Sequence, residues 1–341
     1  MAILTQQKRT YPYDLSVVLP VYNEEDNLKP LHQELEAVLE SMDISYEIIY
    51  VDDGSRDKSR TVMAEISEGS EHTRVVNLRR NFGQTAAIQA GIDQATGAII
   101  TLMDSDMQND PADIPRMKAR MDEGYDLVSG WRKDRKDRMV TRRLPSILAN
   151  GIISRVTNVR LHDYGCTLKM YRREVLDHVR LYGEMHRFIP VLAYAAGAQI
   201  DEMVVNHRPR IHGKSKYGLW RTAKVVLDLM TVTFLTKFNT RPMYIFGGAG
   251  FLFSGLGILS FIAMFFHTLI TGDALVSTPF PLFGAVFTVG GIQCILLGLI
   301  IEMLMRTYYE AQRKGPYAIR EIVTRNVATE TVNNNIPERV Q

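Results

Sequence analysis

Short apolar runs alternate with amphipathic stretches through the first part of the chain. The apolar runs predict buried strands over residues 15–19, 47–51, 74–78, 98–103 and 125–130. The stretches between them predict helices over residues 24–42, 57–69, 84–96 and 111–123, the third ended by Gly97 in a left-handed conformation. Strands that alternate with helices predict an α/β domain whose mostly parallel sheet is covered on both faces.

A second hydrophobic pattern begins near residue 219. Within 219–240, apolar residues recur at helical spacing and would form one stripe: Leu219, Ala223, Leu227, Met230 and Phe234. This stripe predicts an amphipathic helix in a membrane interface, although a helix packed on a soluble core would show the same stripe. Residues 243–270 and 281–301 contain no charged side chain, and each reaches the roughly 20 residues that span a bilayer. We therefore expect an integral membrane protein with two spans.

Basic residues flank these spans on one side only. Lys237 and Arg241 precede the first span, basic residues from Arg306 onward follow the second, and the connecting loop 271–280 has none. The positive-inside rule then predicts that the soluble domain and both termini are cytoplasmic. Glycines on the two spans predict a close approach of the helices and leave a homo-oligomer open: Gly247, Gly248, Gly250, Gly290 and Gly291.

Composition and charge add few constraints. A chain of 341 residues has room for one soluble core and a smaller appendage. The formal net charge is +2, with basic residues concentrated in 132–143 and 207–224. Cys166 and Cys294 lie in unlike surroundings, so we expect no disulfide framework and a reducing compartment. The N-terminus lacks the apolar stretch of a signal peptide, and we expect no nucleic-acid partner.

Polar residues follow the predicted strands at the edge where parallel sheets bind ligands. Pro20, Tyr22 and Glu24 follow the first strand, with Asn23 as a candidate N-cap of the next helix. Asp52 and Asp53 follow the second strand, where a carboxylate can accept a hydrogen bond from a nucleobase or can simply form a turn.

Asp104 and Asp106 follow the fourth strand and carry the sharpest chemical signal. In extended backbone, residues two apart point the same way, so both carboxylates can face one cation. Oxygen ligands favour Mg²⁺ or Mn²⁺, and Gln108 stands where it can add or orient a ligand. Asp110 and Pro111 predict the N-cap and first turn of the following helix.

The ordered motifs resemble those of the inverting family 2 glycosyltransferases with the GT-A fold. The segments concerned are VVLPVYNEEDNL, VDDGSRDKS, RNFGQ and DSDMQNDP. The later HDYGCTLKMYRRE and RIHGKSKYG, followed by two spans, are similar to the polyprenyl-phosphate glycosyltransferases. The resemblance covers nearly all of residues 14–320 and implies four parts. These are a Rossmann-like GT-A domain (1–218), an interfacial helix (219–240), a two-helix transmembrane hairpin (241–306) and a cytoplasmic tail (307–341).

By this resemblance, particular residues receive roles. The nucleoside would be held by Pro20, Tyr22, Glu24, Asp52 and Asp53, and the metal and diphosphate by Asp104, Asp106 and Gln108. Asp163 falls near the transferred sugar, where a turn aspartate is the plainer alternative. The lipid phosphate would be bound by Arg132, Arg210, Ser215 and Lys216, although Arg132 and the basic run behind it also suit a solvated charged helix.

The resemblance implies an inverting transfer from a nucleotide sugar, such as UDP-glucose, to undecaprenyl phosphate. A phosphate monoester has its second pKa near 6, so the acceptor is largely a dianion and needs little help from a base. A GDP-mannose donor with a dolichyl-type acceptor is the alternative within the family. A membrane-tethered protein that binds nucleotide sugars without catalysis, and a soluble transferase with a protein acceptor, are the alternatives outside it. The residues leave the sugar undetermined.

Overall fold

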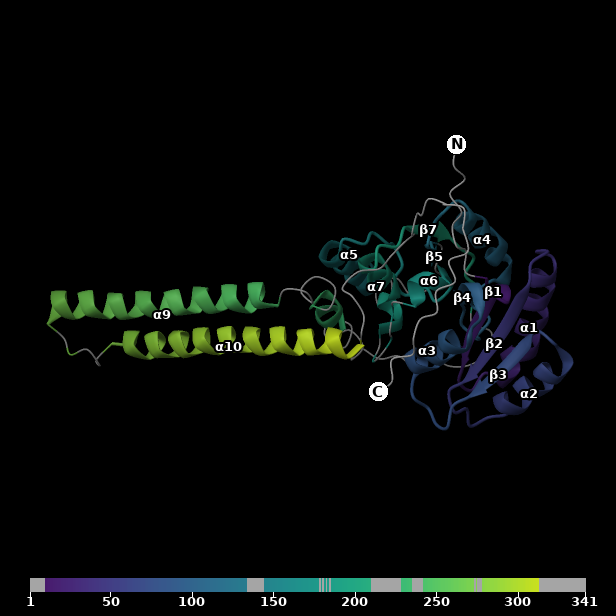
Figure 1. The fold of residues 1–341 in the computed structure, drawn as a ribbon, viewed down its shortest axis with the longest axis horizontal. Helices are drawn as coiled ribbons and strands as arrows, with labels where there is room; N and C mark the ends of the chain where they lie inside the picture. Colours follow the sequence, from purple (N-terminus) through teal and green to yellow (C-terminus); the bar gives the residue numbers. More distant parts are fainter. Residues whose placement is uncertain are drawn as a thin grey trace, which may run out of the picture.

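The computed structural model describes residues 10–133, 144–177, 185–209, 228–234, 242–272 and 278–312, with the single residues 179, 181, 183 and 274. An α/β domain occupies one end of the molecule, and a pair of long helices projects from it (Figure 1). Within the described residues the domain contains one sheet of seven strands: β1 (Tyr13–Val21), β2 (Tyr46–Asp52), β3 (Thr73–Asn77), β4 (Gly97–Leu102), β5 (Leu127–Trp131), β6 (Lys169–Arg172) and β7 (Ile200–Val204).

The strand order is β3-β2-β1-β4-β6-β5-β7, and β6 alone runs antiparallel to its neighbours. The predicted mostly parallel sheet is therefore confirmed. The reversed β6, which the sequence pattern did not reveal, lies between β4 and β5. Since β6 is reversed, its first residue lies at the edge where its parallel neighbours end.

Helices cover both faces of the sheet. Side chains of β1 alternate between two apolar cores, with Leu15, Val17 and Leu19 in one and Val18 in the other. The core that contains Val18 is covered by α3 (Gln84–Gln94), α5 (Leu144–Thr157), α6 (Arg173–Leu176), the 3₁₀ turn η3 (Met185–Phe188) and α7 (Ile189–Ala195). The other core is covered by α1 (Glu25–Glu40), α2 (Ser59–Gly69) and α4 (Ile114–Asp122).

Two predicted helix boundaries are wrong. Gly97 does not end α3 in a left-handed conformation; it is the first residue of β4, and α3 has already ended at Gln94. A side chain at Gly97 would lie 2.8 Å from the backbone nitrogen of Ser16, so glycine is needed for strand packing. Asn23 is not the N-cap of α1, a position held by Glu24. Asn23 has φ 57° and accepts a hydrogen bond from the Arg56 backbone N–H at 2.7 Å.

The start of the fourth helix agrees with the prediction. The Asp110 side chain accepts a hydrogen bond from the Ala112 backbone N–H at 3.1 Å, as an N-cap does. Pro111 opens a 3₁₀ turn, η1 (Pro111–Asp113), which leads directly into α4.

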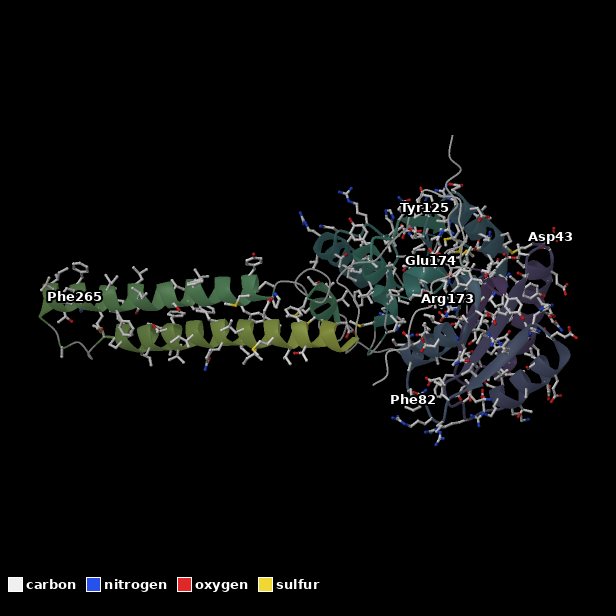
Figure 2. The ribbon with its side chains drawn as sticks, viewed as in Figure 1. Asp43, Phe82, Tyr125, Arg173, Glu174 and Phe265 are labelled. Atoms are coloured by element: carbon white, nitrogen blue, oxygen red, sulfur yellow. The ribbon has the colours of Figure 1, made fainter. Side chains whose placement is uncertain are left out.

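Two long apolar helices, α9 (Met243–Thr271) and α10 (Phe280–Gln312), lie side by side (Figure 1). Each contains a stretch long and apolar enough to cross a bilayer, 29 residues in α9 and 26 in α10. Their large apolar side chains point outward along the hairpin, as Phe265 does near its far end (Figure 2). Ile270 is 81% exposed, and surface of this kind is expected against lipid rather than water.

The predicted close approach of the spans holds for only some of the glycines named. Gly250 and Gly291 lie in the seam between the helices, whereas a side chain at Gly248 or Gly290 would meet nothing within 4 Å. Of the proposed interfacial helix, the structure describes residues 228–234. There Leu229 and Val232 pack into the domain core, and Met230, which the predicted stripe included, is 65% exposed.

Candidate functional site

The carboxyl ends of β1 and β2 carry the residues predicted to hold a nucleoside. Asp53 is buried, and its two carboxylate oxygens accept backbone N–H groups of Phe82 at 2.7 Å and Gly83 at 3.0 Å. Burial raises the pKa of Asp53 above its usual value. Asp52 accepts the Ser55 backbone N–H at 2.9 Å, and its other oxygen lies 3.4 Å from the guanidinium of Arg60. The two carboxylates thus organise the loops after β2 and β3.

The end of β1 is joined to the loop that follows β4. The buried Pro20 offers its carbonyl oxygen to the hydroxyl of Ser105 at 2.9 Å. Tyr22 and Glu24 are half-buried beyond the strand end, and Glu24 accepts the side-chain amide of Asn27 at 2.6 Å. These contacts bring the predicted nucleoside residues and the Asp104 loop to one edge of the sheet.

Each carboxylate oxygen of Asp104 accepts a hydrogen bond from a different part of the chain. Gln84, the first residue of α3, donates to one carboxylate oxygen at 2.8 Å, and the Thr167 hydroxyl donates to the other at 2.6 Å. Burial and the negative charge of Asp106 raise the pKa of Asp104 to about 6, while the Thr167 hydrogen bond acts in the opposite direction. The two carboxylates are therefore close enough to repel each other.

This pair fits a hard divalent cation. The loop turns sharply at Met107, with φ 63°, and Gln108 donates its backbone N–H to Asp106 at 3.1 Å. Within the described residues no cluster of three or more His, Cys, Asp or Glu could enclose a metal. Two neighbouring carboxylates suit Mg²⁺ or Mn²⁺, which commonly take their remaining ligands from water and substrate phosphates.

Residues 206–208 lie across this loop. Asn109 and His207 form an antiparallel bridge, and the Arg208 backbone N–H donates to the Gln108 carbonyl at 2.9 Å. The Arg208 guanidinium also donates to Asp110 at 2.8 Å, and the Asn206 side-chain amide donates to the same carboxylate at 2.7 Å. The loop of Asp104 and Asp106 is thus tied to the segment that follows β7.

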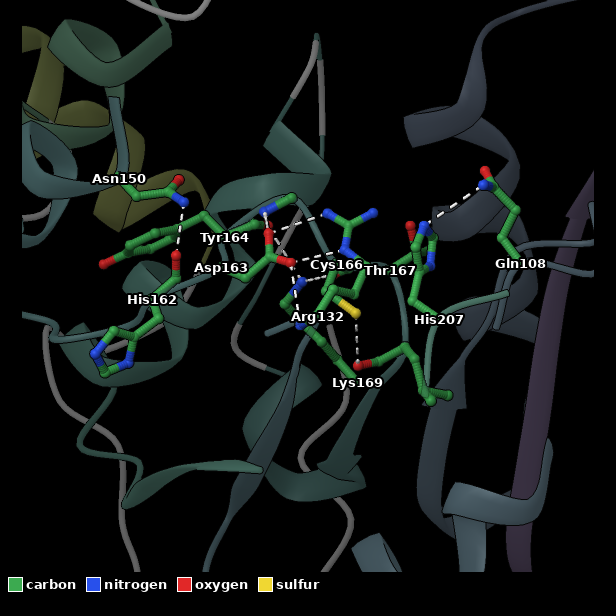
Figure 3. A network of polar contacts seen from close by, with 12 residues as sticks. Gln108, Arg132, Asn150, His162, Asp163, Tyr164, Cys166, Thr167, Lys169 and His207 are labelled. Carbon is green, nitrogen blue, oxygen red and sulfur yellow. Dashed lines mark hydrogen bonds and ion pairs between the residues drawn. The ribbon is translucent and has the colours of Figure 1, made fainter. Parts of the chain in front are cut away.

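Arg132 and Asp163 face each other in a two-pronged ion pair (Figure 3). The Nε of Arg132 donates to one oxygen of Asp163 at 2.7 Å, and Nη2 donates to the other at 3.0 Å. Burial works to lower the pKa of Arg132, but the Asp163 carboxylate outweighs it, and the pKa is raised. The solvated-helix alternative therefore does not describe Arg132, whose side chain is only 12% exposed.

Lys169 is a buried cation of the same cluster, which Figure 3 shows below the Arg132 pair. Its ammonium donates to the carbonyl oxygens of Cys166 and Tyr164, the latter at 3.2 Å. Burial lowers the pKa of Lys169, and the charges of Asp163 and Asp104 oppose that shift. Both cations therefore lie within electrostatic reach of Asp104.

A histidine extends the cluster under α3. Thr85 directly follows Gln84, which donates to Asp104. The hydroxyl of Thr85 lies 2.7 Å from Nδ1 of His186. Burial, with the charges of Arg187 and Lys169, lowers the pKa of His186 to about 3. His186 is therefore neutral at physiological pH.

The structure brings most of the predicted site residues to one edge of the sheet. Arg210, Ser215 and Lys216 lie outside the described residues. Sequence reasoning overlooked Gln84, Thr167, Lys169 and His186. Thr167 and Lys169 stand within the quoted HDYGCTLKMYRRE motif, so that motif was the signal that could have found them.

Comparison with known proteins agrees with this arrangement. Residues 16–180 match the family model described as glycosyl transferase family 2. The chain is 44% identical over 316 residues to the dodecaprenyl-phosphate galacturonate synthase of Rhizobium johnstonii, covering 91% of this chain and 93% of the relative. It is 38% identical over 322 residues to the undecaprenyl-phosphate 4-deoxy-4-formamido-L-arabinose transferase of Pseudomonas aeruginosa, covering 92% of each chain.

Solved structures share the fold. One is glucosyl-3-phosphoglycerate synthase from Mycobacterium tuberculosis in complex with Mn²⁺, UDP and phosphoglyceric acid. It has a TM-score of 0.52 at 18% identity, and the match covers 68% of this chain and 87% of that one. The same enzyme in complex with Mg²⁺ and UDP has a TM-score of 0.51 at 19% identity, covering 65% and 80% of the two chains. On the full-length similarity of its relatives, the chain belongs to glycosyl transferase family 2, among its polyprenyl-phosphate sugar transferases.

Proposed function

We propose that the protein transfers a sugar, with inversion, from a nucleotide donor to a polyprenyl phosphate at the cytoplasmic membrane surface. The proposal is supported chiefly by one juxtaposition: Asp104, beside the carboxylate of Asp106, lies within electrostatic reach of Arg132, in a chain with two membrane-length helices. Carboxylates suit the metal-bound diphosphate of a donor, and a guanidinium suits a phosphate acceptor.

The donor would lie across the carboxyl ends of β1, β2 and β4. Pro20, Tyr22, Glu24, Asp52 and Asp53 would hold its nucleoside, and Asp104, Asp106 and Gln108 would face its diphosphate. A Mg²⁺ or Mn²⁺ ion held there would neutralise the charge that develops on the leaving diphosphate. Solved structures of the same fold that contain Mn²⁺ or Mg²⁺ with UDP support a divalent cation and a uridine donor.

The acceptor phosphate would be bound by cations of the chain. Arg132 would meet it at the site, and Arg210, Ser215 and Lys216 would hold it from the segment before the spans. These residues would neutralise the dianion and orient it for a single in-line displacement. An α-linked donor sugar would then emerge β-linked, and the prenyl chain would remain in the bilayer beside α9 and α10.

The sugar is proposed from the relatives. The relative with 44% identity is named for galacturonate, and those at 36–39% are named for 4-deoxy-4-formamido-L-arabinose. We therefore place UDP-galacturonate ahead of UDP-glucose as the first donor to test, with undecaprenyl phosphate or a similar polyprenyl phosphate as the acceptor.

The test uses the full chain reconstituted in lipid nanodiscs with undecaprenyl phosphate and Mn²⁺ or Mg²⁺. Radiolabelled UDP-galacturonate, UDP-4-deoxy-4-formamido-L-arabinose, UDP-glucose and GDP-mannose are offered separately. We expect one of them to label the lipid and chelation to stop the transfer. The double variant Asp104→Asn/Asp106→Asn should lose at least 10³-fold in rate, whereas Asp122→Asn, on the exposed side of α4, should not. No labelled lipid with any donor would refute the proposal.

A further inference from the structure

The carboxylate of Asp163 is already fully engaged by the protein. One oxygen accepts Nε of Arg132 at 2.7 Å and the Arg132 backbone N–H at 3.4 Å. The other accepts Nη2 of Arg132 at 3.0 Å and the Gly165 backbone N–H at 3.1 Å. Only 5% of the Asp163 side chain is exposed. A general base must present a lone pair to the proton that it removes, and these oxygens face donors of the protein instead.

Glu202 fixes the loop that carries Asp163. One oxygen of Glu202 accepts the backbone N–H groups of His162 at 2.8 Å and Asp163 at 3.1 Å. The other lies 2.6 Å from Nδ1 of His162. The His162 ring stacks on Trp131, with centroids 4.2 Å apart and planes 15° apart. The loop is therefore held by Glu202 of β7, by Trp131 at the end of β5 and by Arg132 directly after that strand.

One edge of the Arg132 guanidinium, that of Nη1, is not engaged by Asp163. A guanidinium has five N–H donors, and Asp163 engages it through Nε and Nη2. Within the described residues, Nη1 of Arg132 has no hydrogen bond. The charge of Arg132 acts on Asp104, so its guanidinium lies within electrostatic reach of a carboxylate that would face the donor diphosphate.

We propose that Asp163 is a positioning residue, held by Glu202, that aims the free edge of Arg132 at a phosphoryl oxygen, and that it is not the base of the transfer. This inference rests on the proposed function. A dianionic acceptor needs no base, whereas a guanidinium that must meet a phosphate benefits from a fixed orientation. The phosphoryl oxygen belongs either to the lipid phosphate or to the donor diphosphate, and the measurements below distinguish the two.

The kinetic test compares Arg132→Ala, Asp163→Ala and the double variant in nanodiscs. A positioning role predicts that each single change lowers kcat/KM by about 10- to 100-fold and that the double change costs no more than the worse single one. If Asp163 is a base, the two losses multiply. The loss should fall on the KM of undecaprenyl phosphate if Arg132 meets the acceptor, and on the KM of the donor if it meets the diphosphate.

Two further variants separate positioning from folding. Asp163→Asn should keep the pH dependence of kcat, whereas removal of a base would abolish its acidic limb. Glu202→Gln should raise the same KM as Asp163→Asn, by about 3- to 10-fold. Its matched control is Asp201→Asn, the neighbour in β7 whose carboxylate pairs with Arg120 at 2.8 Å away from the site. A loss in kcat alone that multiplies with Arg132→Ala would overturn the proposal.

A binding measurement separates failure of this inference from failure of the proposed function. Undecaprenyl phosphate and UDP are titrated separately into the detergent-solubilised protein, without any transfer. We expect Arg132→Ala and Asp163→Ala to weaken binding of the same one of these two probes, by about 10-fold or more. If wild-type protein transfers no sugar but this paired effect persists, the positioning role stands without the activity. If neither variant changes either affinity, the positioning role is wrong.

Discussion

Gly250 of α9 and Gly291 of α10 each leave room for the other's backbone. A Cβ on either residue would lie 2.8 Å from the carbonyl oxygen of its partner. Further glycines meet the opposite helix at intervals of seven residues, namely Gly257 on α9 and Gly284 and Gly298 on α10. A seven-residue spacing keeps the seam on one face of each helix along the hairpin.

Replacement of Gly291 by leucine should separate the two helices. The added side chain would clash with Ser254 and with the carbonyl oxygen of Gly250. We therefore expect the Tm of the detergent-solubilised protein to fall by several degrees. Gly290→Leu is the matched control, because a Cβ at Gly290 meets nothing within 4 Å. Equal Tm values for the two variants would show that the seam does not hold the hairpin together.

Removal of the Thr167 hydroxyl should weaken metal activation. Thr167→Val deletes the hydrogen bond to Asp104, which favours the charged carboxylate. We expect the Mn²⁺ concentration for half-maximal activity to rise by about 3- to 10-fold, with the rate recovered at saturating metal. The control is Thr101→Val in β4, whose buried hydroxyl finds no hydrogen-bond partner among the described residues. An unchanged Mn²⁺ requirement in Thr167→Val would count against a metal ligand at Asp104.

Loss of the Arg208 side chain should loosen the loop between Gln108 and Asp110. Arg208 bridges Asp110 at 2.8 Å and Glu34 at 2.5 Å, with its own side chain 30% exposed. We expect Arg208→Ala to lower the free energy of unfolding by ~1 to 2 kcal/mol and to raise the Mn²⁺ requirement.

Arg116→Ala serves as the control for that change. Arg116 is 60% exposed and pairs with Asp113 within the same short segment. If the Arg208→Ala protein keeps the wild-type Mn²⁺ requirement, the contacts of Arg208 contribute to stability and not to metal activation.

His186 should make stability depend on acidity. Its pKa of about 3 in the folded protein lies below the ordinary 6.5, so the unfolded chain binds more protons between these values. Stability is therefore full above pH 6.5 and falls as the pH drops toward 3, by at most about 1.4 kcal/mol per pH unit from this group. His186→Gln should flatten the dependence of Tm on pH between 6.5 and 4.5. The same substitution at the exposed His72 is the comparison variant, and equal slopes in both variants would refute the assignment.

The sequence was sufficient for the elements that follow simple periodicity. β1, β2 and α1 have long apolar patterns, so their predicted ranges agree closely with the observed elements. The placement of Asp104 and Asp53 at one edge followed from the general property that parallel strands end together.

Other parts depend on tertiary pairing that no local pattern records. β6 has four residues and begins with a lysine, so it does not stand out as a strand. Arg132 and Asp163 were both named as candidates, but their pairing joins positions 31 residues apart with α5 between them. Gly97 was misread because its glycine serves close packing against Ser16 rather than a turn.

The reversed strand β6 also constrains the order in which the protein can become functional. Asp104 takes one partner from 20 residues earlier and the other from 63 residues later. The later partner, Thr167, lies just before β6. β6 pairs with both β4 and β5, although it is synthesised after them. The sheet therefore cannot form strand by strand in the order of synthesis, and contacts of such long sequence separation form slowly. A nascent chain that ends before Thr167 contains the carboxylates of Asp104 and Asp106 but lacks the hydroxyl that donates to Asp104.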